Sequence, residues 1–308
     1  MARIVISEFM DERAVHNLRA VHDVLYEPGL VDDGPRLIAE ASTAECLIVR
    51  NRTQVRGALL EALNHCKVVG RLGVGLDNID VEGCGARGMQ VIPATGANAL
   101  SVAEYVICSA MILLRGAYQH SDAVAAGKWP RAALSNGRET AGKVLGIIGF
   151  GSIGRMVAEL ARALGMQVIA YDPMLQADDP AFQSGAVSYS DLDPLIARSD
   201  VVTLHVPLVE GTRNLFDARR IAAMKHGAVL INSSRGHIVD VPAAVQSLRA
   251  GHLGGVAIDV FDTEPLPADE ALRHCPQLLL TPHISGVSAE SNERVSFMIA
   301  DKVLEALR

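Results

Sequence analysis

The chain has 308 residues, which is enough for two domains of ordinary size, each with its own hydrophobic core. Hydrophobic residues make up 49% of the sequence, aromatic residues 4%, and the formal net charge is −7. This composition is typical of a soluble globular protein, and an acidic chain without a run of lysine and arginine argues against nucleic-acid binding.

Short apolar, β-branched segments in the first hundred residues predict five strands. They are Arg3–Ser7, Asp23–Tyr26, Cys46–Arg50, Val68–Leu72 and Met89–Pro93. Helical patterns fall between them, for example at Gln54–Asn64. Such alternation favours a parallel sheet with helices on both faces.

A long apolar helix comes next, and its predicted start is near Ser101 because Ser101 and Glu104 have capping-box spacing. Its most apolar part, Tyr105–Leu114, is too short to cross a bilayer, so we expect a buried helix.

A second series of strands follows at Val144–Phe150, Gln167–Tyr171, Val201–Val206, Ala228–Asn232, Gly255–Val260 and Leu278–Thr281. The last of these reads as a buried strand. A final helix at about Ser288–Leu307 is too small for a domain, so we expect it to pack on the first series.

A glycine motif lies in the segment VLGIIGFGSIGRMVAELARALGMQVIAYD, where Gly149, Gly151 and Gly154 have G-x-G-x-x-G order between a strand and a helix. The pattern alone is weak, but in this context it predicts a turn that lets a pyrophosphate approach the helix N-terminus. Asp172, 18 residues after the last glycine, can accept hydrogen bonds from an adenosine ribose and would repel a 2′-phosphate. The motif therefore predicts NAD rather than NADP; the alternative is a turn without a nucleotide.

Polar and charged residues follow three further strands of the second series. They are Ser233, Ser234 and Arg235 in NSSRG, Asp259 and Glu264 in AIDVFDTEP, and His283 in TPHISG. Each could be an ordinary surface or capping group, but we expect them to meet at the edge where such sheets bind ligands. Hydride transfer at a hydroxyl carbon needs an acid/base for the hydroxyl proton, a carboxylate that orients it, and a cation for the substrate.

In order, GFGSIG…D, NSSRG, AIDVFDTEP and TPHISG resemble the D-isomer-specific 2-hydroxyacid dehydrogenase family over essentially the whole chain. The resemblance implies that Arg235 binds the substrate, Glu264 pairs with His283, and His283 is the acid/base. Asp259 would contact the nicotinamide amide. The implied cofactor contacts are Gly149, Gly151, Ser152, Ile153, Gly154, Asp172, His205, Val206, Pro207, Ser233, Ser234, Asp259, His283 and Gly286. The family also implies a homodimer, and no metal is expected.

The sequence departs from the family pattern at three positions. His237 stands where a second glycine is usual, Ser152 replaces a common arginine, and Ser285 replaces a small apolar residue. The fold expected from the resemblance is α/β, with two doubly wound parallel-sheet domains. A Rossmann NAD-binding domain (99–283) is inserted into a flavodoxin-like substrate-binding domain (1–98 plus 284–308).

Candidate substrate contacts lie in the first domain. GRLGVGLDNID resembles the family's carboxylate loop, in which the N–H groups of Val74 and Gly75 would bind an anion; the alternative is a plain strand-to-helix turn. Arg50, Arg52 and Arg71 lie near strand ends, and Arg131 is a further candidate, from the same or from a neighbouring subunit. Arginine suits tetrahedral oxyanions, so we expect a second anionic group on the 2-hydroxy acid, unless these arginines are solvated surface charges.

The stretches VISEFMDE and PATGANALSVAEY most resemble (S)-sulfolactate dehydrogenases, which makes oxidation of (S)-3-sulfolactate to 3-sulfopyruvate the first expectation. A D-3-phosphoglycerate dehydrogenase and a broad 2-ketoacid reductase are the alternatives, and a non-catalytic, NAD-sensing corepressor-like protein is the alternative from another class.

The five cysteines are widely spread with no C-x-x-C pair, and the N-terminus lacks the apolar core of a signal peptide. Both features favour the cytoplasm.

Overall fold

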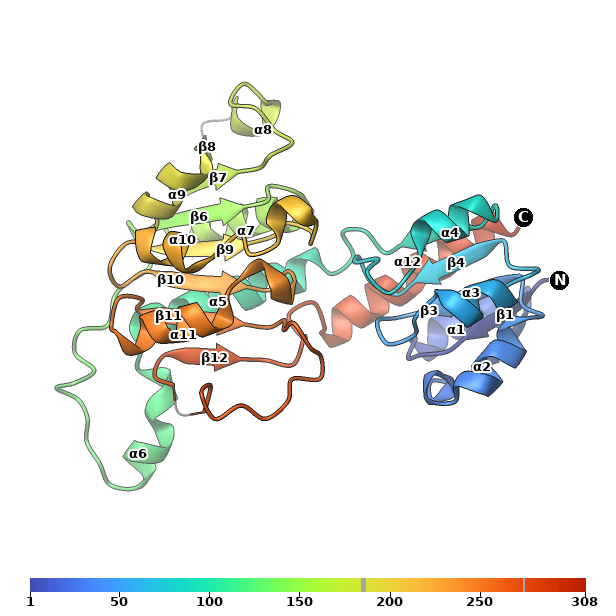
Figure 1. The fold of residues 1–308 in the computed structure, drawn as a ribbon, viewed down its shortest axis with the longest axis horizontal. Coiled ribbons are helices and arrows are strands. Elements are labelled where there is room, and N and C mark those ends of the chain that lie inside the picture. The colour runs from blue at the N-terminus through green and yellow to red at the C-terminus, as the bar shows by residue number, and fades with distance from the viewer. Residues whose placement is uncertain (184–186, 274) are drawn as a thin grey trace. The chain divides into compact units, whose positions relative to one another are not determined.

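The computed structural model describes residues 1–183, 187–273 and 275–308, which form two compact units. Unit 1 consists of Met1–Asn98 and Val287–Arg308, and unit 2 of Ala99–Gly286, so unit 2 is inserted into unit 1 along the chain. Both units contain a parallel sheet with alternating helices (Figure 1).

Unit 1 has a five-stranded parallel sheet in the order β2-β1-β3-β4-β5. The strands are β1 (Arg3–Ile6), β2 (Asp23–Tyr26), β3 (Cys46–Val49), β4 (Val68–Arg71) and β5 (Gln90–Pro93). Helices α1 (Glu12–Arg19) and α12 (Ala289–Ala306) pack in the core on one face, and α2 (Gly34–Ala41), α3 (Gly57–Ala62) and α4 (Val81–Ala86) pack on the other. A short 3-10 turn, η1 (Leu30–Asp32), precedes α2. All four residues of β3 are buried, as expected of an apolar strand covered on both faces.

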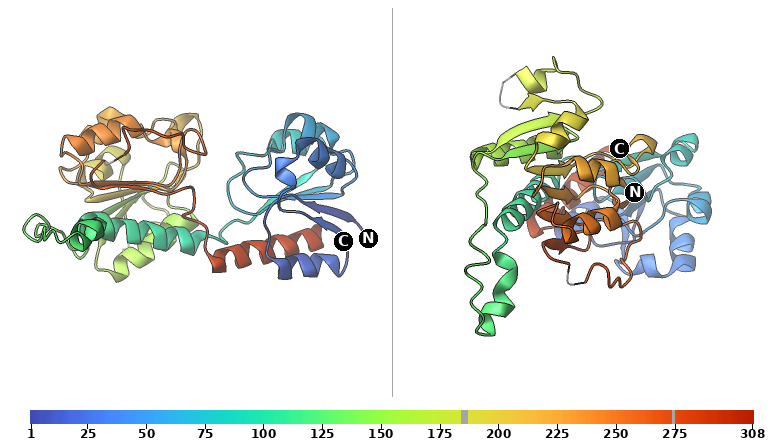
Figure 2. Two further views of the ribbon diagram at one scale, coloured as in Figure 1. Left: turned by 90° about the horizontal axis from the view of Figure 1, so that it is seen from below. Right: turned by 60° about the vertical axis from the view of Figure 1, so that its left-hand side comes forward.

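Unit 2 has a seven-stranded parallel sheet in the order β12-β11-β10-β9-β6-β7-β8. The strands are β6 (Val144–Ile148), β7 (Gln167–Tyr171), β8 (Ser188–Tyr189), β9 (Val201–Leu204), β10 (Val229–Asn232), β11 (Gly255–Ile258) and β12 (Leu278–Leu280). Helices α5 (Ala99–Arg115) and α7 (Ser152–Ala163) belong to the core on one face, and α9 (Leu192–Arg198), α10 (Ala218–Ala223) and α11 (Val241–Arg249) to the core on the other. Figure 2 shows this sheet between its two helical layers.

The remaining elements of unit 2 are short. They are η2 (Tyr118–His120), α6 (Ser121–Ala125), α8 (Pro180–Gln183), η3 (Glu210–Thr212) and η4 (Gly236–Ile238). Among the described residues, no single helix is long and apolar enough to cross a membrane. Helix α5 together with Tyr118–Ala125 meets that test only as a pair bent by 68°.

The predicted α/β class is confirmed: every predicted strand is present, and the last helix packs in the core of unit 1. The predicted capping box is wrong, because α5 begins at Ala99 and Ser101 is a buried residue inside the helix. The prediction of a buried last strand is also wrong. Strand β12 lies at the edge of its sheet, and Leu280 is 37% exposed. Strand β8 has only two residues and gave no recognisable pattern.

Candidate active site

The strand order of unit 2 brings five candidate residues to one edge of its sheet. Strands β6, β9, β10, β11 and β12 are parallel neighbours, so their carboxyl ends lie side by side. The residues just after these ends are Gly149, His205, Arg235, Asp259 and His283. This edge, outside the carboxyl ends of the strands, is where open α/β sheets bind their ligands.

The turn after β6 has the backbone geometry that the glycine motif predicts. Gly149 has φ +94°, and a Cβ atom there would lie 2.6 Å from the carbonyl carbon and oxygen of His205. A Cβ at Gly154 would lie 2.3 Å from the oxygen of Gly149, whereas a Cβ at Gly151 would meet nothing within 4 Å. Helix α7 begins at Ser152 without a side-chain cap. Its first N–H groups, close to the open face at Gly151, therefore fit the pyrophosphate of a dinucleotide.

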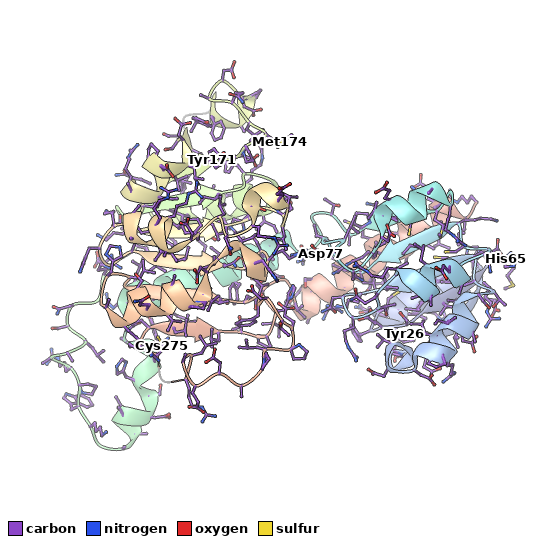
Figure 3. All side chains as sticks on the ribbon, viewed as in Figure 1. Tyr26, His65, Asp77, Tyr171, Met174 and Cys275 are labelled. Atoms are coloured by element: carbon purple, nitrogen blue, oxygen red, sulfur yellow. The ribbon has the colours of Figure 1, made fainter. Side chains whose placement is uncertain are left out.

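Asp172 follows β7 and ties that strand to the glycine turn. Its Oδ2 accepts a hydrogen bond from the Phe150 N–H (2.8 Å), and its Oδ1 accepts one from the Met174 N–H (2.9 Å). Figure 3 labels Tyr171, the residue before it, and Met174, two residues after it. Each carboxylate oxygen can accept a further hydrogen bond, so the residue fits the predicted ribose contact.

The ends of β9 and β10 supply a neutral imidazole and two serine hydroxyls. Burial lowers the pKa of His205 to about 3, so its ring is neutral near neutral pH, and its Nε2 lies 3.0 Å from the Thr203 hydroxyl. The Ser234 hydroxyl donates to the Leu204 carbonyl. Among the described residues, the buried Ser233 hydroxyl has no hydrogen-bond partner, as expected of a group that contacts a bound ligand.

His283 and Glu264 form a hydrogen-bonded pair. The Nδ1 atom of His283 lies 2.7 Å from Oε2 of Glu264, and Oε1 of Glu264 accepts a hydrogen bond from the Phe261 N–H (2.9 Å). The two side chains are 40% and 34% exposed. The carboxylate is thus held by its own loop and in turn orients the imidazole.

Asp259 fixes the turn that carries His283. Its side chain is fully buried. Oδ1 accepts hydrogen bonds from the Thr281 hydroxyl (2.6 Å) and the Ile284 N–H (2.8 Å), and Oδ2 accepts one from the Ser285 N–H (2.9 Å). The His283 N–H donates to the Asp259 carbonyl (2.8 Å), and His283 has φ +53°, an uncommon conformation for a side chain of this size. The structure therefore gives Asp259 a structural part in the site, which the sequence did not indicate.

The loop with Arg235 packs against the loop with Glu264. A Cβ at Gly236 would lie 2.2 Å from the carbonyl carbon of Phe261, so only glycine permits this approach. Arg235 Nη1 donates to the Ser234 carbonyl (2.6 Å). His237, the departure from the family pattern, has its Nδ1 3.4 Å from Oδ1 of the exposed Asp262. Arginine, carboxylate and imidazole are therefore carried by adjoining loops of one unit.

In unit 1, Arg50 and Arg71 follow or end the neighbouring strands β3 and β4. Arg71 Nη1 donates to the Leu72 carbonyl (3.0 Å), and a Cβ at Gly73 (φ +155°) would collide with that nitrogen. The guanidinium thus lies over the predicted carboxylate loop, in which Val74 and Gly75 are partly exposed.

Arg50 and Arg52 have different surroundings, although one residue separates them. Arg50 Nη2 donates to Asn292 Oδ1 (2.7 Å), and burial lowers its pKa. The Arg52 side chain instead forms an exposed ion pair with Asp32. The structure therefore does not bring Arg52 together with Arg50. Among the described residues, no three histidine, cysteine, aspartate or glutamate side chains gather in a way that could hold a metal ion.

Comparison with known proteins gives a consistent result. Residues 107–285 match the NAD-binding domain of D-isomer-specific 2-hydroxyacid dehydrogenases. The chain is 50% identical to the (S)-sulfolactate dehydrogenase of Chromohalobacter salexigens over 307 residues, which covers 100% of this chain and 99% of the relative. It is 34% identical to the D-3-phosphoglycerate dehydrogenase of Methanocaldococcus jannaschii, of which it spans only 58%.

A solved structure supports the same assignment. The D-lactate dehydrogenase of Aquifex aeolicus, complexed with NAD and lactic acid, matches with a TM-score of 0.84 at 26% identity. The match covers 99% of this chain and 95% of that one.

Proposed function

Because this chain belongs to the D-isomer-specific 2-hydroxyacid dehydrogenases, we propose that it interconverts (S)-3-sulfolactate and 3-sulfopyruvate with NAD as the hydride carrier. It is an NAD-dependent oxidoreductase of 2-hydroxy acids. The observation that carries the choice of substrate is the 50% identity to a sulfolactate dehydrogenase along the full chain, together with the half-buried Arg50 after β3.

In the proposed reaction, His283 accepts the hydroxyl proton of the 2-hydroxy acid as the hydride leaves the same carbon. NAD supplies the hydride acceptor. The bond from Nδ1 to Glu264 stabilises the imidazolium that forms and leaves proton exchange to Nε2. Arg235 binds the substrate carboxylate and polarises the oxygen at the reacting carbon.

Replacing the imidazole tests these roles. His283→Ala should abolish turnover and leave the Kd for NAD nearly unchanged, because Gly149, Gly151 and Asp172 hold the cofactor elsewhere on the edge. Turnover at the wild-type rate would remove His283 from the acid/base role.

For the substrate, we propose that Val74, Gly75 and Arg71 bind the carboxylate together with Arg235, and that Arg50 binds the sulfonate. Arg50→Met keeps an unbranched side chain but removes the charge. It should lower kcat/KM for sulfolactate and leave kcat/KM for D-lactate, which has no distal anion, nearly unchanged. An equal loss on both acids would mean that Arg50 does not bind the distal group. If the wild type prefers D-3-phosphoglycerate, the distal anion of the substrate is a phosphate and not a sulfonate.

We further propose a cytoplasmic homodimer. The segment after α5, with η2 and α6, extends away from the sheet of unit 2 (Figures 1 and 2). It exposes Tyr118 (65%), Val124 (46%) and Trp129 (78%). Exposed apolar side chains that gather on one segment are typical of a protein interface. Light scattering should give a mass of about two chains, and Trp129→Glu should shift that mass toward one chain.

A further inference from the structure

At the carboxyl end of β1, a buried carboxylate gathers the loop that carries Arg50. Glu8 is only 4% exposed. Its Oε1 accepts hydrogen bonds from the Arg50 N–H (2.8 Å) and the Thr53 N–H (3.0 Å), and its Oε2 accepts one from the Arg52 N–H (3.1 Å). One side chain that follows β1 therefore fixes three backbone groups that follow β3.

Further polar side chains hold the same loop in place. The Ser7 and Thr53 hydroxyls lie 2.9 Å apart. Asn78 Nδ2 donates to the Arg50 carbonyl (3.1 Å) and to the Thr53 carbonyl (2.7 Å). Both ends of the loop are thus held by neighbouring segments of unit 1. This fixes the position of the Arg50 Cα atom and the direction of its Cα–Cβ bond.

The Arg50 guanidinium is held by neutral groups. Asn292 accepts its hydrogen bond, and its Cζ lies 5.8 Å from the centre of the Phe9 ring. In the ranges that the structure describes, no carboxylate lies within ion-pair distance of Arg50, whereas Arg52 pairs with Asp32. The three hydrogen bonds to the Glu8 carboxylate all come from backbone N–H groups, so Glu8 forms no ion pair with the Arg50 guanidinium. Burial lowers the pKa of Arg50, and the nearby Glu8 charge partly opposes that shift.

We infer that Glu8 is a positioning residue: it holds the Arg50 backbone so that the guanidinium can bind the distal anion of the substrate. Phe9 and Asn292 orient the guanidinium. The inference deepens the proposed function and rests on it. An arginine whose direct contacts are neutral can still form an ion pair with a ligand anion, and a preformed loop avoids the cost of ordering it on binding. The site fits a compact sulfonate or phosphate on a short 2-hydroxy acid.

A substitution at Glu8 should therefore change substrate selection. Glu8→Gln replaces one acceptor oxygen by an NH₂ group, which must face a backbone N–H donor, so part of the loop loses its support. We expect KM for sulfolactate to rise about tenfold, with kcat and the KM for D-lactate within about twofold of the wild type. Glu8→Asp keeps both carboxylate oxygens, so its KM for sulfolactate should lie between those of the wild type and Glu8→Gln.

A matched control is available in the same region. Asp32→Asn removes an exposed carboxylate that contacts the neighbouring Arg52, so both KM values should stay at the wild-type level. In an Arg50→Met background, Glu8→Gln should produce no further loss on sulfolactate, because the group that it positions is already gone.

The outcomes separate the inference from the proposed function. A wild type without preference for sulfolactate or phosphoglycerate over D-lactate would refute the proposed distal anion and this inference with it. The inference alone would be overturned if the wild type prefers the acids with a distal anion but Glu8→Gln raises the KM for sulfolactate and for D-lactate equally, or raises neither. If that variant does not fold, Asn292→Leu should cause the same selective rise in KM, and unchanged selectivity there would overturn it.

Discussion

The Glu264–His283 pair allows a prediction whose size follows from its geometry. Glu264→Gln keeps the shape of the side chain but removes the charge that stabilises a protonated imidazole. The Nδ1 to Oε2 distance of 2.7 Å is short, and hydrogen bonds to charged groups contribute roughly 1.5–3 kcal/mol. Because Glu264 is 34% exposed, solvent screening reduces this to about 1–2 kcal/mol, or roughly 5- to 30-fold in kcat/KM.

The assay is initial-rate formation of NADH with saturating NAD and varied hydroxy acid. Asp262→Asn is the matched control, because Asp262 lies on the same loop, is 63% exposed and contacts His237 rather than His283. The control should keep the wild-type kcat/KM. A Glu264→Gln variant within about twofold of the wild type would refute the role of the pair in catalysis.

Three further predictions concern other parts of unit 2 and the buried thiols. Asp259→Asn should lower the free energy of unfolding by about 2–4 kcal/mol in urea titrations, because an NH₂ group would replace an acceptor oxygen in a buried network, and an unchanged midpoint would contradict this. Asp172→Ala should raise the kcat/KM ratio of NADP to NAD about tenfold by removing repulsion of the 2′-phosphate, whereas an unchanged ratio would place the ribose elsewhere. Burial raises the pKa of Cys66 to about 11, so a thiol reagent at pH 8 should modify the exposed Cys108 and spare Cys66; rapid labelling of Cys66 would contradict the fold of unit 1.

The fold was largely predictable because its strands are apolar and lie in regular alternation with helices. Strand β3, with four buried residues, is an example. The errors lie where local pattern and tertiary packing compete. Ser101 has capping-box spacing but is buried in the interior of α5, and Leu278–Leu280 is apolar yet forms an edge strand. Sequence spacing does not reveal which edge of a sheet remains uncovered.

The candidate site was predictable where a residue type and a strand end coincide, as for Arg235, Asp259 and His283. Contacts between distant segments were not. Glu8 follows β1 by two residues, but nothing in its local pattern shows that it holds the loop after β3. Likewise, Arg50 and Arg52 look equivalent in sequence, and they are distinguished only by their tertiary contacts, with Asn292 for Arg50 and with Asp32 for Arg52. Such distinctions depend on hydrogen bonds between elements that are brought together by the sheet order.

The most direct test is a comparison of kcat/KM for the wild-type enzyme with NAD and a panel of 2-hydroxy acids. The panel should contain both stereoisomers of sulfolactate, 3-phosphoglycerate, lactate and glycerate. The account predicts that (S)-sulfolactate exceeds lactate and glycerate by at least about tenfold, because Arg50 is placed for a distal anion. It also predicts a preference for (S)-sulfolactate over 3-phosphoglycerate, which rests on the 50% identity to a sulfolactate dehydrogenase. Equal and slow rates on all acids would contradict a distal anion site at Arg50 and the choice of substrate that depends on it.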